Sequence, residues 1–419
     1  MTTKTISQIF TYIKEEQLRQ DKVINLIASE NIASNNIIKA QASRLVNKYA
    51  EGYTGNRFYN GCQIIDSIES AAIENAKALF KCKYVNVQAH SGSNANLAAY
   101  MAVLKPNDKI LSLNLKDGGH LTHGSKASKI SDIFNFSHYS LDSNQKIDYD
   151  QVQEIAMKEK PQMIIAGYSS YSLMPNWQRF AKIAKKCGAY FLADMSHVSG
   201  IVAAKPHLSP VGYADIITST THKTLRGPRG AIILTNDANI AKKIDSSVFP
   251  GLQGGPFVNV IAAKAVAFAE ALQPSFIVYI NHMLHLAKVM CNKLIAENID
   301  IVTGDTNTHL LLINLTKFNL CGNTVSHYLE RAGIIVNKNT IPNDTKGPLA
   351  TSGIRLGTAA IATLNMTAAQ AVAVAGHIAL IIKTLAKNEN QIEAVVCEIR
   401  EEVAKITTTL NINEQIQKS

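Results

Sequence analysis

The sequence predicts an α/β fold, in which a mostly parallel sheet is covered by helices on both faces. The chain has 419 residues, 46% of them hydrophobic, which is enough to bury a large core and to form two domains. Over residues 82–234, short apolar runs alternate with amphipathic helical stretches. A second, shorter α/β unit follows after a long helical connection.

The elements are expected in a simple order along the chain. A helical arm, roughly residues 7–47, comes first. Short apolar runs then predict strands at residues 84–87, 109–113, 163–166, 190–193, 215–218 and 231–234. Long helices are expected over residues 256–298, and further strands near residues 310–315 and 334–336. We therefore divide the chain into an N-terminal helical arm (1–45), a large domain (46–275) and a small C-terminal α/β domain (276–419).

The net charge of +10 comes from 42 Lys and Arg against 32 Asp and Glu. Such a surface attracts anions in general. The lysines are dispersed through helical stretches, without an Arg-rich run or interleaved aromatic residues, so nucleic acid is not an expected partner.

Six scattered cysteines form no C-x-x-C pair and no Cys/His ligand spacing, so free thiols and no metal site are expected. The first twenty residues lack the unbroken apolar core of a secretory signal. The apolar run 368–385 approaches the length of a membrane span, but Gln370, His377 and Lys383 would be costly in hydrocarbon. We expect a core helix there, and a cytoplasmic protein without a membrane segment.

Lys223 is the first residue that suggests chemistry. It lies in a threonine-rich turn at the end of a predicted strand. A lysine that attacks an aldehyde must spend time neutral, and the cationic neighbours Arg226, Arg229 and His222 would lower its pKa in that direction. Alone, such a lysine is more often an ordinary loop residue.

Asp194 ends the next strand upstream, and His197 follows three residues later. Ligands of open α/β sheets bind beyond the carboxyl ends of the strands. A carboxylate there can keep a pyridine nitrogen protonated, although an aspartate that caps the following helix would look the same.

A third motif, Ser91, Gly92 and Ser93, follows a strand and opens a helix. Backbone N–H groups and hydroxyls at a helix N-terminus bind anions, so we call this motif the phosphate seat, although a plain serine-rich cap would look similar. Together the amine, the acid and the seat meet the needs of pyridoxal phosphate (PLP): a covalent anchor, a charge partner for the ring and a site for the phosphate. We predict that PLP forms a Schiff base with Lys223.

Eight separated motifs occur in order: LIASEN (26–31), NKYAEGY (47–53), RFYNGC (57–62), NVQAHSGS (86–93), GGHLTHG (118–124), TTHKT (220–224), FPGLQGGP (249–256) and TSGIRLG (351–357). In these motifs, and over nearly its whole length, the chain resembles the serine hydroxymethyltransferase family. The resemblance implies the aspartate-aminotransferase-like fold of PLP-dependent transferases, with a mostly parallel seven-stranded sheet in the large domain. It also implies reversible conversion of L-serine and tetrahydrofolate to glycine and 5,10-methylenetetrahydrofolate, through a Schiff base between serine and PLP.

The resemblance assigns a role to each matching residue. It implies catalytic roles for Lys223, Glu51, His120, Asp194 and His222. It implies cofactor contacts for Ser91, Gly92, Ser93, His120, Ser169, Asp194, His197 and Lys223, and, from a neighbouring subunit, for Tyr49, Gly254 and Gly255. Substrate contacts fall on Ser29, Tyr59, Arg355 and Glu51, and folate contacts on Leu115, Leu121 and Asn339. Because the site would be shared between subunits, a homodimer is expected, with a tetramer as the alternative.

The sequence departs from the family pattern at several positions. Ala89 stands where a proline is usual, Phe58 where a tyrosine is usual, and Leu349 where phenylalanine is frequent. Segment 357–365 lacks the usual proline and the later arginine and glycine. None of these changes removes a catalytic group. We expect Phe58 to affect folate affinity at most, and segment 357–365 to affect the packing of the small domain.

Two other functions fit parts of the sequence. A threonine or allo-threonine aldolase would use PLP without folate, and serine cleavage that tetrahydrofolate does not stimulate would favour it. An aminotransferase fits the setting of Lys223 less well. A non-catalytic RNA-binding protein on the same fold would stay colourless after reconstitution with PLP.

Overall fold

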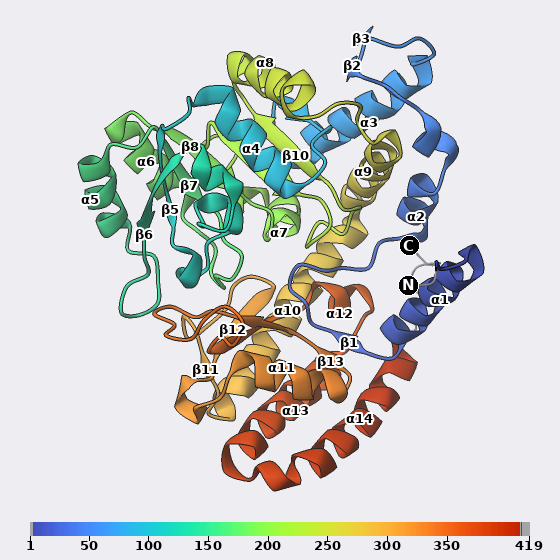
Figure 1. Ribbon diagram of the computed structural model, residues 1–419, viewed down its shortest axis with the longest axis vertical. Helices are drawn as coiled ribbons and strands as arrows, with labels where there is room; N and C mark the ends of the chain where they lie inside the picture. The colour runs from blue at the N-terminus through green and yellow to red at the C-terminus, as the bar shows by residue number, and fades with distance from the viewer. Residues whose placement is uncertain (1–2, 411, 413–419) are drawn as a thin grey trace.

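The computed structural model describes residues 3–410 and 412. In Figure 1 a large sheet with its helices lies above a smaller sheet and the long C-terminal helices. The large sheet has seven strands in the order β4-β10-β9-β8-β7-β5-β6. Strand β10 is antiparallel to both neighbours, and the other pairs are parallel. The predicted α/β class and the mostly parallel sheet are therefore confirmed.

The strands of this sheet are β4 (Tyr84–Asn86), β5 (Lys109–Leu113), β6 (Asn135–Tyr139), β7 (Met163–Ala166), β8 (Tyr190–Asp194), β9 (Ile216–Thr220) and β10 (Ala231–Thr235). All but β6 were expected from apolar runs. Strand β6 lies at the sheet edge, where most of its side chains are partly or fully exposed, so polar residues occupy it and no apolar run marks it.

Side chains of the central strands alternate between two apolar clusters, one on each face of the sheet. In β7, Ile164 and Ala166 join the larger cluster, which continues into the C-terminal part, whereas Met163 and Ile165 join the cluster that also contains residues of α4 and α8. The helices around this sheet are α3 (Gln63–Phe80), α4 (Gly92–Val103), α5 (Tyr149–Glu159), α6 (Trp177–Cys187), α7 (Ser199–Ala204), α8 (Ala238–Ser246) and α9 (Val258–Ala271).

The N-terminal arm is less continuous than expected. It comprises α1 (Ile6–Asp21), β1 (Ile24–Asn25), α2 (Asn35–Gln41) and a 3-10 turn (Arg44–Asn47). Strand β1 interrupts the helices because it pairs in parallel with β13 (Ile334–Ile335), far along the chain. None of the side chains of α1 is buried.

The C-terminal part contains a four-stranded antiparallel sheet in the order β11-β12-β15-β14. Its strands are β11 (Asp300–Ile301), β12 (Leu310–Asn314), β14 (Asn337–Asn339) and β15 (Gly353–Gly357), and its helices are α10 (Pro274–Ala296), α11 (Gly322–Arg331), α12 (Ala359–Thr363), α13 (Ala368–Lys387) and α14 (Ile392–Thr409). A small hairpin, β2 (Gly52–Tyr53) and β3 (Asn56–Arg57), completes the strands. Residue 275 lies in the first turn of α10, and the domain boundaries stay a prediction.

Helix α13 is the expected core helix of residues 368–385. By length and composition it could cross a membrane, as could the sharply bent pair of α9 and α10 if counted as one segment. Half of the most apolar stretch of α13 is buried, and the helix packs against α10 and α14. Lys383 in α13 pairs with Glu297 at 2.5 Å, which satisfies its charge within the fold.

Candidate active site

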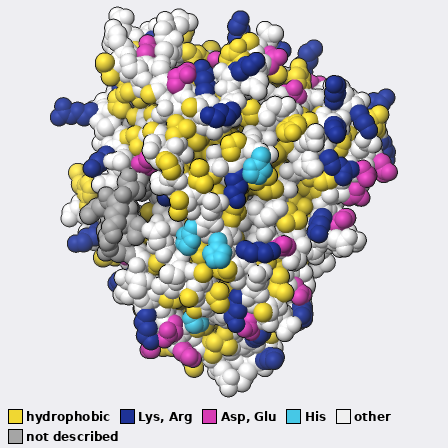
Figure 2. Space-filling model, turned by 180° about the vertical axis from the view of Figure 1, so that it is seen from behind, with side chains coloured by type: hydrophobic (Ala, Val, Ile, Leu, Met, Phe, Trp, Pro, Cys, Tyr) yellow, Lys and Arg dark blue, Asp and Glu magenta, His cyan; other side chains and the backbone are white. Residues whose placement is uncertain are grey.

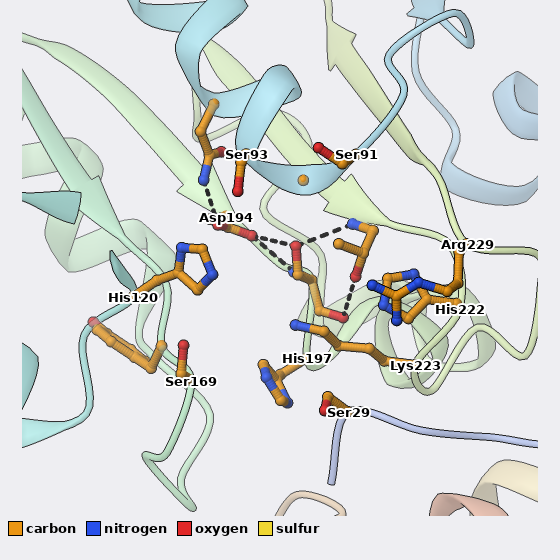
Figure 3. Close-up of a pocket in the computed structure, with 15 residues that line it drawn as sticks. Ser29, Ser91, Ser93, His120, Ser169, Asp194, His197, His222, Lys223 and Arg229 are labelled. Carbon is orange, nitrogen blue, oxygen red and sulfur yellow. Dashed lines mark hydrogen bonds between the residues drawn. The ribbon is translucent and has the colours of Figure 1, made fainter. Parts of the chain in front are cut away.

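A cavity of about 260 Å³ lies beyond the carboxyl ends of the central parallel strands, where ligands of α/β sheets bind. Figure 3 shows His120, Asp194 and Lys223 facing the same space, with Ser91 and Ser93 at one side of it. The lining residues are Ser29, Ser91, Gly92, Ser93, Asn96, His120, Tyr168, Ser169, Asp194, Ser196, His197, Thr220, His222, Lys223 and Arg229. The three motifs that the sequence singled out therefore meet in one place.

Lys223 is buried in the turn that follows β9. Burial lowers the pKa of its amine to about 8; Asp194 opposes this change, and Arg355 and Arg229 add to it. About a tenth of the amine is therefore neutral at pH 7, far more than for an ordinary lysine, and the neutral form is the one a nucleophile requires.

The cations near Lys223 differ from those expected. Arg229 acts as predicted, but the guanidinium of Arg226 lies over the ring of Tyr279, 4.7 Å from its centroid. Burial, with Lys223 and Arg229, lowers the pKa of His222 to about 3, so that this imidazole is neutral and adds no positive charge. The pKa of Lys223 is therefore lowered by burial and by Arg355, which is remote in sequence, rather than by Arg226 and His222.

The turn that carries Lys223 is held on several sides. Asn31 Nδ2 donates to the carbonyl of Lys223 at 2.8 Å. The Thr224 hydroxyl donates to the His197 carbonyl and accepts from the Gly200 N–H, both at 3.0 Å. These bonds restrict the direction from which the amine enters the cavity.

Asp194 ends β8 as a buried carboxylate. Asn96 Nδ2 donates to its Oδ2 at 3.0 Å, and His123 Nε2 lies 3.1 Å from the same oxygen. The backbone N–H and the hydroxyl of Ser196 donate to Oδ1 at 3.1 and 2.6 Å. Burial by itself would raise the pKa of Asp194, but His123, His120 and Ser196 hold it well below its ordinary value, so the carboxylate stays ionised.

Sequence reasoning did not single out Asn96, His123 or Ser196. Each lies inside or beside a motif that was found: Asn96 one helical turn after Ser93, and His123 within GGHLTHG. Their bonds to Asp194 join segments up to 98 residues apart, so only the fold reveals them.

The phosphate seat is formed where α4 begins. Ser91 is the N-cap residue, and its hydroxyl accepts a hydrogen bond from the Asn94 N–H at 3.3 Å. A Cβ atom on Gly92 would lie 2.7 Å from Thr220 Cγ2, so a glycine is needed for the helix to begin this close to β9. The first N–H groups of a helix have no intrahelical partner and therefore remain available to an anion.

Two further histidines line the cavity in neutral form. Burial, with His123 contributing, lowers the pKa of His120 to about 4, and burial with Lys223 keeps that of His197 well below its ordinary value. His197 stacks on His309 with ring centroids 5.5 Å apart. Neutral imidazoles offer flat faces without adding positive charge beside Lys223.

A second cavity of about 270 Å³ adjoins the first. The two share Ser29, His120, Ser169, His197 and Lys223, and the second is also lined by Leu115, Gly119, Leu121, Ser170, Asn339, Thr340 and Arg355. Arg355, on β15, donates to the Ser169 carbonyl at 2.6 Å and to Asn337 Oδ1 at 3.1 Å. Burial lowers its pKa only to about 10, so Arg355 is a cation at neutral pH. All three predicted folate residues thus line a cavity that Lys223 also lines.

The remaining predicted residues form a separate group, which we call the Tyr49 cluster: Tyr49, Glu51, Tyr59, Gly254 and Gly255. Within the described part of the chain, neither cavity is lined by any of them. The rings of Tyr49 and Tyr59 meet edge to face with centroids 5.3 Å apart. A Cβ atom on Gly254 would lie 3.5 Å from Glu51 Oε1, and one on Gly255 would lie 3.1 Å from the Tyr49 ring. Both tyrosines are about half exposed, so this cluster faces outward.

The seven-stranded sheet and its strand-end site define the aspartate-aminotransferase-like fold of PLP-dependent transferases. The profile of the family described as serine hydroxymethyltransferase matches residues 3–378. The chain therefore belongs to the serine hydroxymethyltransferase family.

Similar proteins cover nearly the whole chain. It is 47% identical over 420 residues to a serine hydroxymethyltransferase of Orientia tsutsugamushi (strain Ikeda), covering 97% of this chain and 99% of that protein. It is 50% identical over 401 residues to serine hydroxymethyltransferase 2 of Salmonella typhi, covering 96% and 95%. It is also 50% identical over 387 residues to a probable serine hydroxymethyltransferase of Rickettsia bellii (strain RML369-C), covering 92% of each.

Proposed function

We propose that this chain converts L-serine and tetrahydrofolate reversibly to glycine and 5,10-methylenetetrahydrofolate, with PLP held on Lys223. The observation that carries the proposal is the convergence of Lys223, Asp194 and the phosphate seat on one cavity. Membership of the family supports the reaction. We further propose that the protein acts as a cytoplasmic homodimer.

The residues present fit PLP. Lys223 would hold its aldehyde carbon, the phosphate seat its phosphate, Asp194 its ring nitrogen and His120 one face of its ring. His222 Nδ1, on a side chain that lines this cavity, is buried without a hydrogen-bond partner among the described residues, as expected for a site that binds a polar group. When bound, PLP supplies an electron sink for charge released at the substrate α-carbon.

The protein groups supply charge and orientation. Asp194 stays ionised and can therefore hold a proton on a ring nitrogen, which strengthens an electron sink. Arg355 presents a cationic, planar fork suited to a carboxylate, so it would bind and orient the carboxylate of serine or glycine. Lys223 can accept and return a proton near neutral pH because its pKa is about 8.

The second cavity supports a folate-dependent reaction. Leu115 and Leu121 are 38% and 52% exposed and offer apolar surface to a flat ring, with the polar side chain of Asn339 lining the same cavity. This cavity reaches Lys223 and Arg355, so a bound folate would lie beside the substrate. We therefore favour the folate-dependent transferase over a folate-independent aldolase.

The Tyr49 cluster supports a shared active site. Its residues gather on one chain but lie outside that chain's own cavities. We propose that they complete the cavity of a second copy, where Glu51 would manage the proton of the substrate hydroxyl.

The decisive experiment compares the wild-type protein with Lys223→Ala. The variant should lose normal turnover and remain a folded dimer, whereas turnover at the wild-type rate would overturn the proposal. Serine cleavage by the wild type is measured with and without tetrahydrofolate, and absence of stimulation would favour the aldolase.

A non-catalytic, RNA-binding role predicts a different result. On the face in Figure 2, Lys and Arg side chains are spread over much of the surface with acidic side chains among them. A protein that gains no visible absorbance with PLP but binds RNA in a salt-sensitive manner would support that role.

A further inference from the structure

Lys264, on α9, is a lysine with only 1% of its side chain exposed, and the mechanism above does not use it. Its ammonium donates to the carbonyls of Val87, Ala89 and Ala231, at 2.6, 3.1 and 2.8 Å. An ammonium has three N–H donors, and each meets an acceptor here. A neutral amine would direct a lone pair at one of the carbonyls, so this geometry suits the charged form.

Moving an ammonium group out of water costs free energy, so a buried lysine is expected to have a structural or functional role. Burial lowers the pKa of Lys264 to about 7, although Glu69 acts in the opposite direction. The three carbonyls belong to two segments: residues 87–89 after β4, which we call the strap, and the first residue of β10. Lys264 therefore joins these two segments through its side chain.

The strap needs such support because it has left the sheet but remains buried. Strand β4 ends at Asn86, whereas Val87, Gln88 and Ala89 are all at most 2% exposed. The Ala89 carbonyl still accepts from the Ala231 N–H of β10 at 3.2 Å. The other buried backbone groups of the strap must find their hydrogen bonds elsewhere. Gln253 supplies two of them, because its Nε2 donates to the Gln88 carbonyl at 2.9 Å and its Oε1 accepts from the His90 N–H at 3.0 Å.

The peptide group between residues 89 and 90 is thus held at both ends. Its carbonyl accepts from Lys264 and from the Ala231 N–H, and its N–H donates to Gln253. The next residue along the chain is Ser91, the N-cap of α4 and the first residue of the phosphate seat. The direction in which the chain enters the seat is therefore set by bonds one residue earlier.

We infer that Lys264 is a positioning residue for the phosphate seat: its three hydrogen bonds fix the strap so that the first N–H groups of α4 face the cavity. The inference rests on the proposed function, because it takes Ser91–Ser93 as the site of the PLP phosphate. Lys264 touches neither cavity and acts only through the backbone.

The test compares the affinity of the cofactor-free full-length protein for PLP and for pyridoxal, which lacks the phosphate. The dissociation constant for pyridoxal divided by that for PLP measures how much the phosphate seat contributes to binding. In Lys264→Met, which keeps the apolar stem and loses the donors, we expect the ratio to fall about tenfold. Lys264→Gln keeps two N–H donors on a neutral side chain and should recover part of the ratio.

A merely structural role would give another pattern. Ile378→Ala, a buried change in α13, serves as the matched control, because it destabilises the fold away from the strap and should leave the ratio unchanged. The inference is overturned if Lys264→Met weakens PLP and pyridoxal equally, if it leaves the ratio intact, or if Lys264→Gln is no better than Lys264→Met. If neither variant folds, Gln253→Ala is measured instead, because it removes the other side-chain hydrogen bonds to the strap. An unchanged ratio in that variant would overturn the inference.

The wild-type measurements separate this inference from the proposed function. A wild-type protein that does not prefer PLP to pyridoxal would overturn both. A wild-type protein with that preference, together with unaffected variants, would overturn the role of Lys264 alone.

Discussion

At the scale of single residues, burial decides the charge of the groups around the cavity. Lys223 is partly neutral, and His120 and His222 are neutral, because each would lose hydration on charging. Asp194 is also buried but stays ionised, because its carboxylate takes part in four hydrogen bonds. At neutral pH the charge in the site is therefore carried by Asp194, the arginines and the protonated fraction of Lys223.

The pKa of Lys223 predicts how fast the cofactor-free protein captures PLP at different pH values. Only the neutral amine attacks an aldehyde, so the rate should rise with pH and level off above about 8. An ordinary lysine would still show a rising rate up to 10.5. Stopped-flow absorbance between pH 6 and pH 10 measures the midpoint, and a midpoint near the ordinary value would contradict the prediction.

Asp194→Asn tests the carboxylate. The amide cannot hold a ring nitrogen protonated by charge, so kcat should fall by about 10²- to 10³-fold while PLP is still captured. Ser196→Ala is the matched control, because it leaves the carboxylate and removes only the hydroxyl that donates to Asp194 and accepts from the Thr220 N–H. Its kcat should fall far less. Steady-state assays with saturating PLP give both values, and equal activity of Asp194→Asn and wild type would refute the assigned role.

At the scale of elements, close approach of β15 to the segment after β1 positions Arg355 and Ser29. The N–H of Gly357 donates to the Leu26 carbonyl at 2.8 Å. A Cβ atom on Gly357 would lie 2.3 Å from Ala28 Cα, so the two backbones touch. This contact lies beside two predicted substrate residues.

Gly357→Ala should therefore destabilise the fold by about 1–3 kcal/mol, because backbone atoms rather than a flexible side chain must move. Gly347→Ala is the control, since a Cβ atom there would meet no atom within 4 Å. Urea unfolding of both variants measures the difference. Equal free energies of unfolding would show that the contact is looser than described.

How much the sequence predicts depends on whether a signal is local. Strands such as β5 and β7 are continuous apolar runs and were placed correctly. The edge strand β6 and the two-residue β1 carry no such run, because pairing with distant strands rather than composition defines them. The same holds in the site: Lys223 and Asp194 end strands and are visible in the sequence, whereas Asn96 and His123 matter only through contacts across the fold.

At the scale of the whole molecule, the Tyr49 cluster predicts that activity needs two chains. A hybrid dimer of Lys223→Ala and Glu51→Gln subunits should regain activity, because the subunit with intact Lys223 receives Glu51 from its partner. Random mixing gives roughly half hybrids with one working site of two, so about a quarter of wild-type activity is expected. If Glu51 served its own chain, every site would lack one group, and the mixture would stay as inactive as each variant alone.

Pairing of β1 with β13 has a consequence for how the protein is made. Ile24 pairs with Ile334, and Ala28 accepts a hydrogen bond at its carbonyl from His309 Nε2 at 2.9 Å. Ser29 follows directly, so its place at the cavity depends on residues that leave the ribosome some 300 positions later, at roughly 5–20 residues per second. Residues 24–29 therefore cannot take their final place against β13 and His309 until translation has nearly finished.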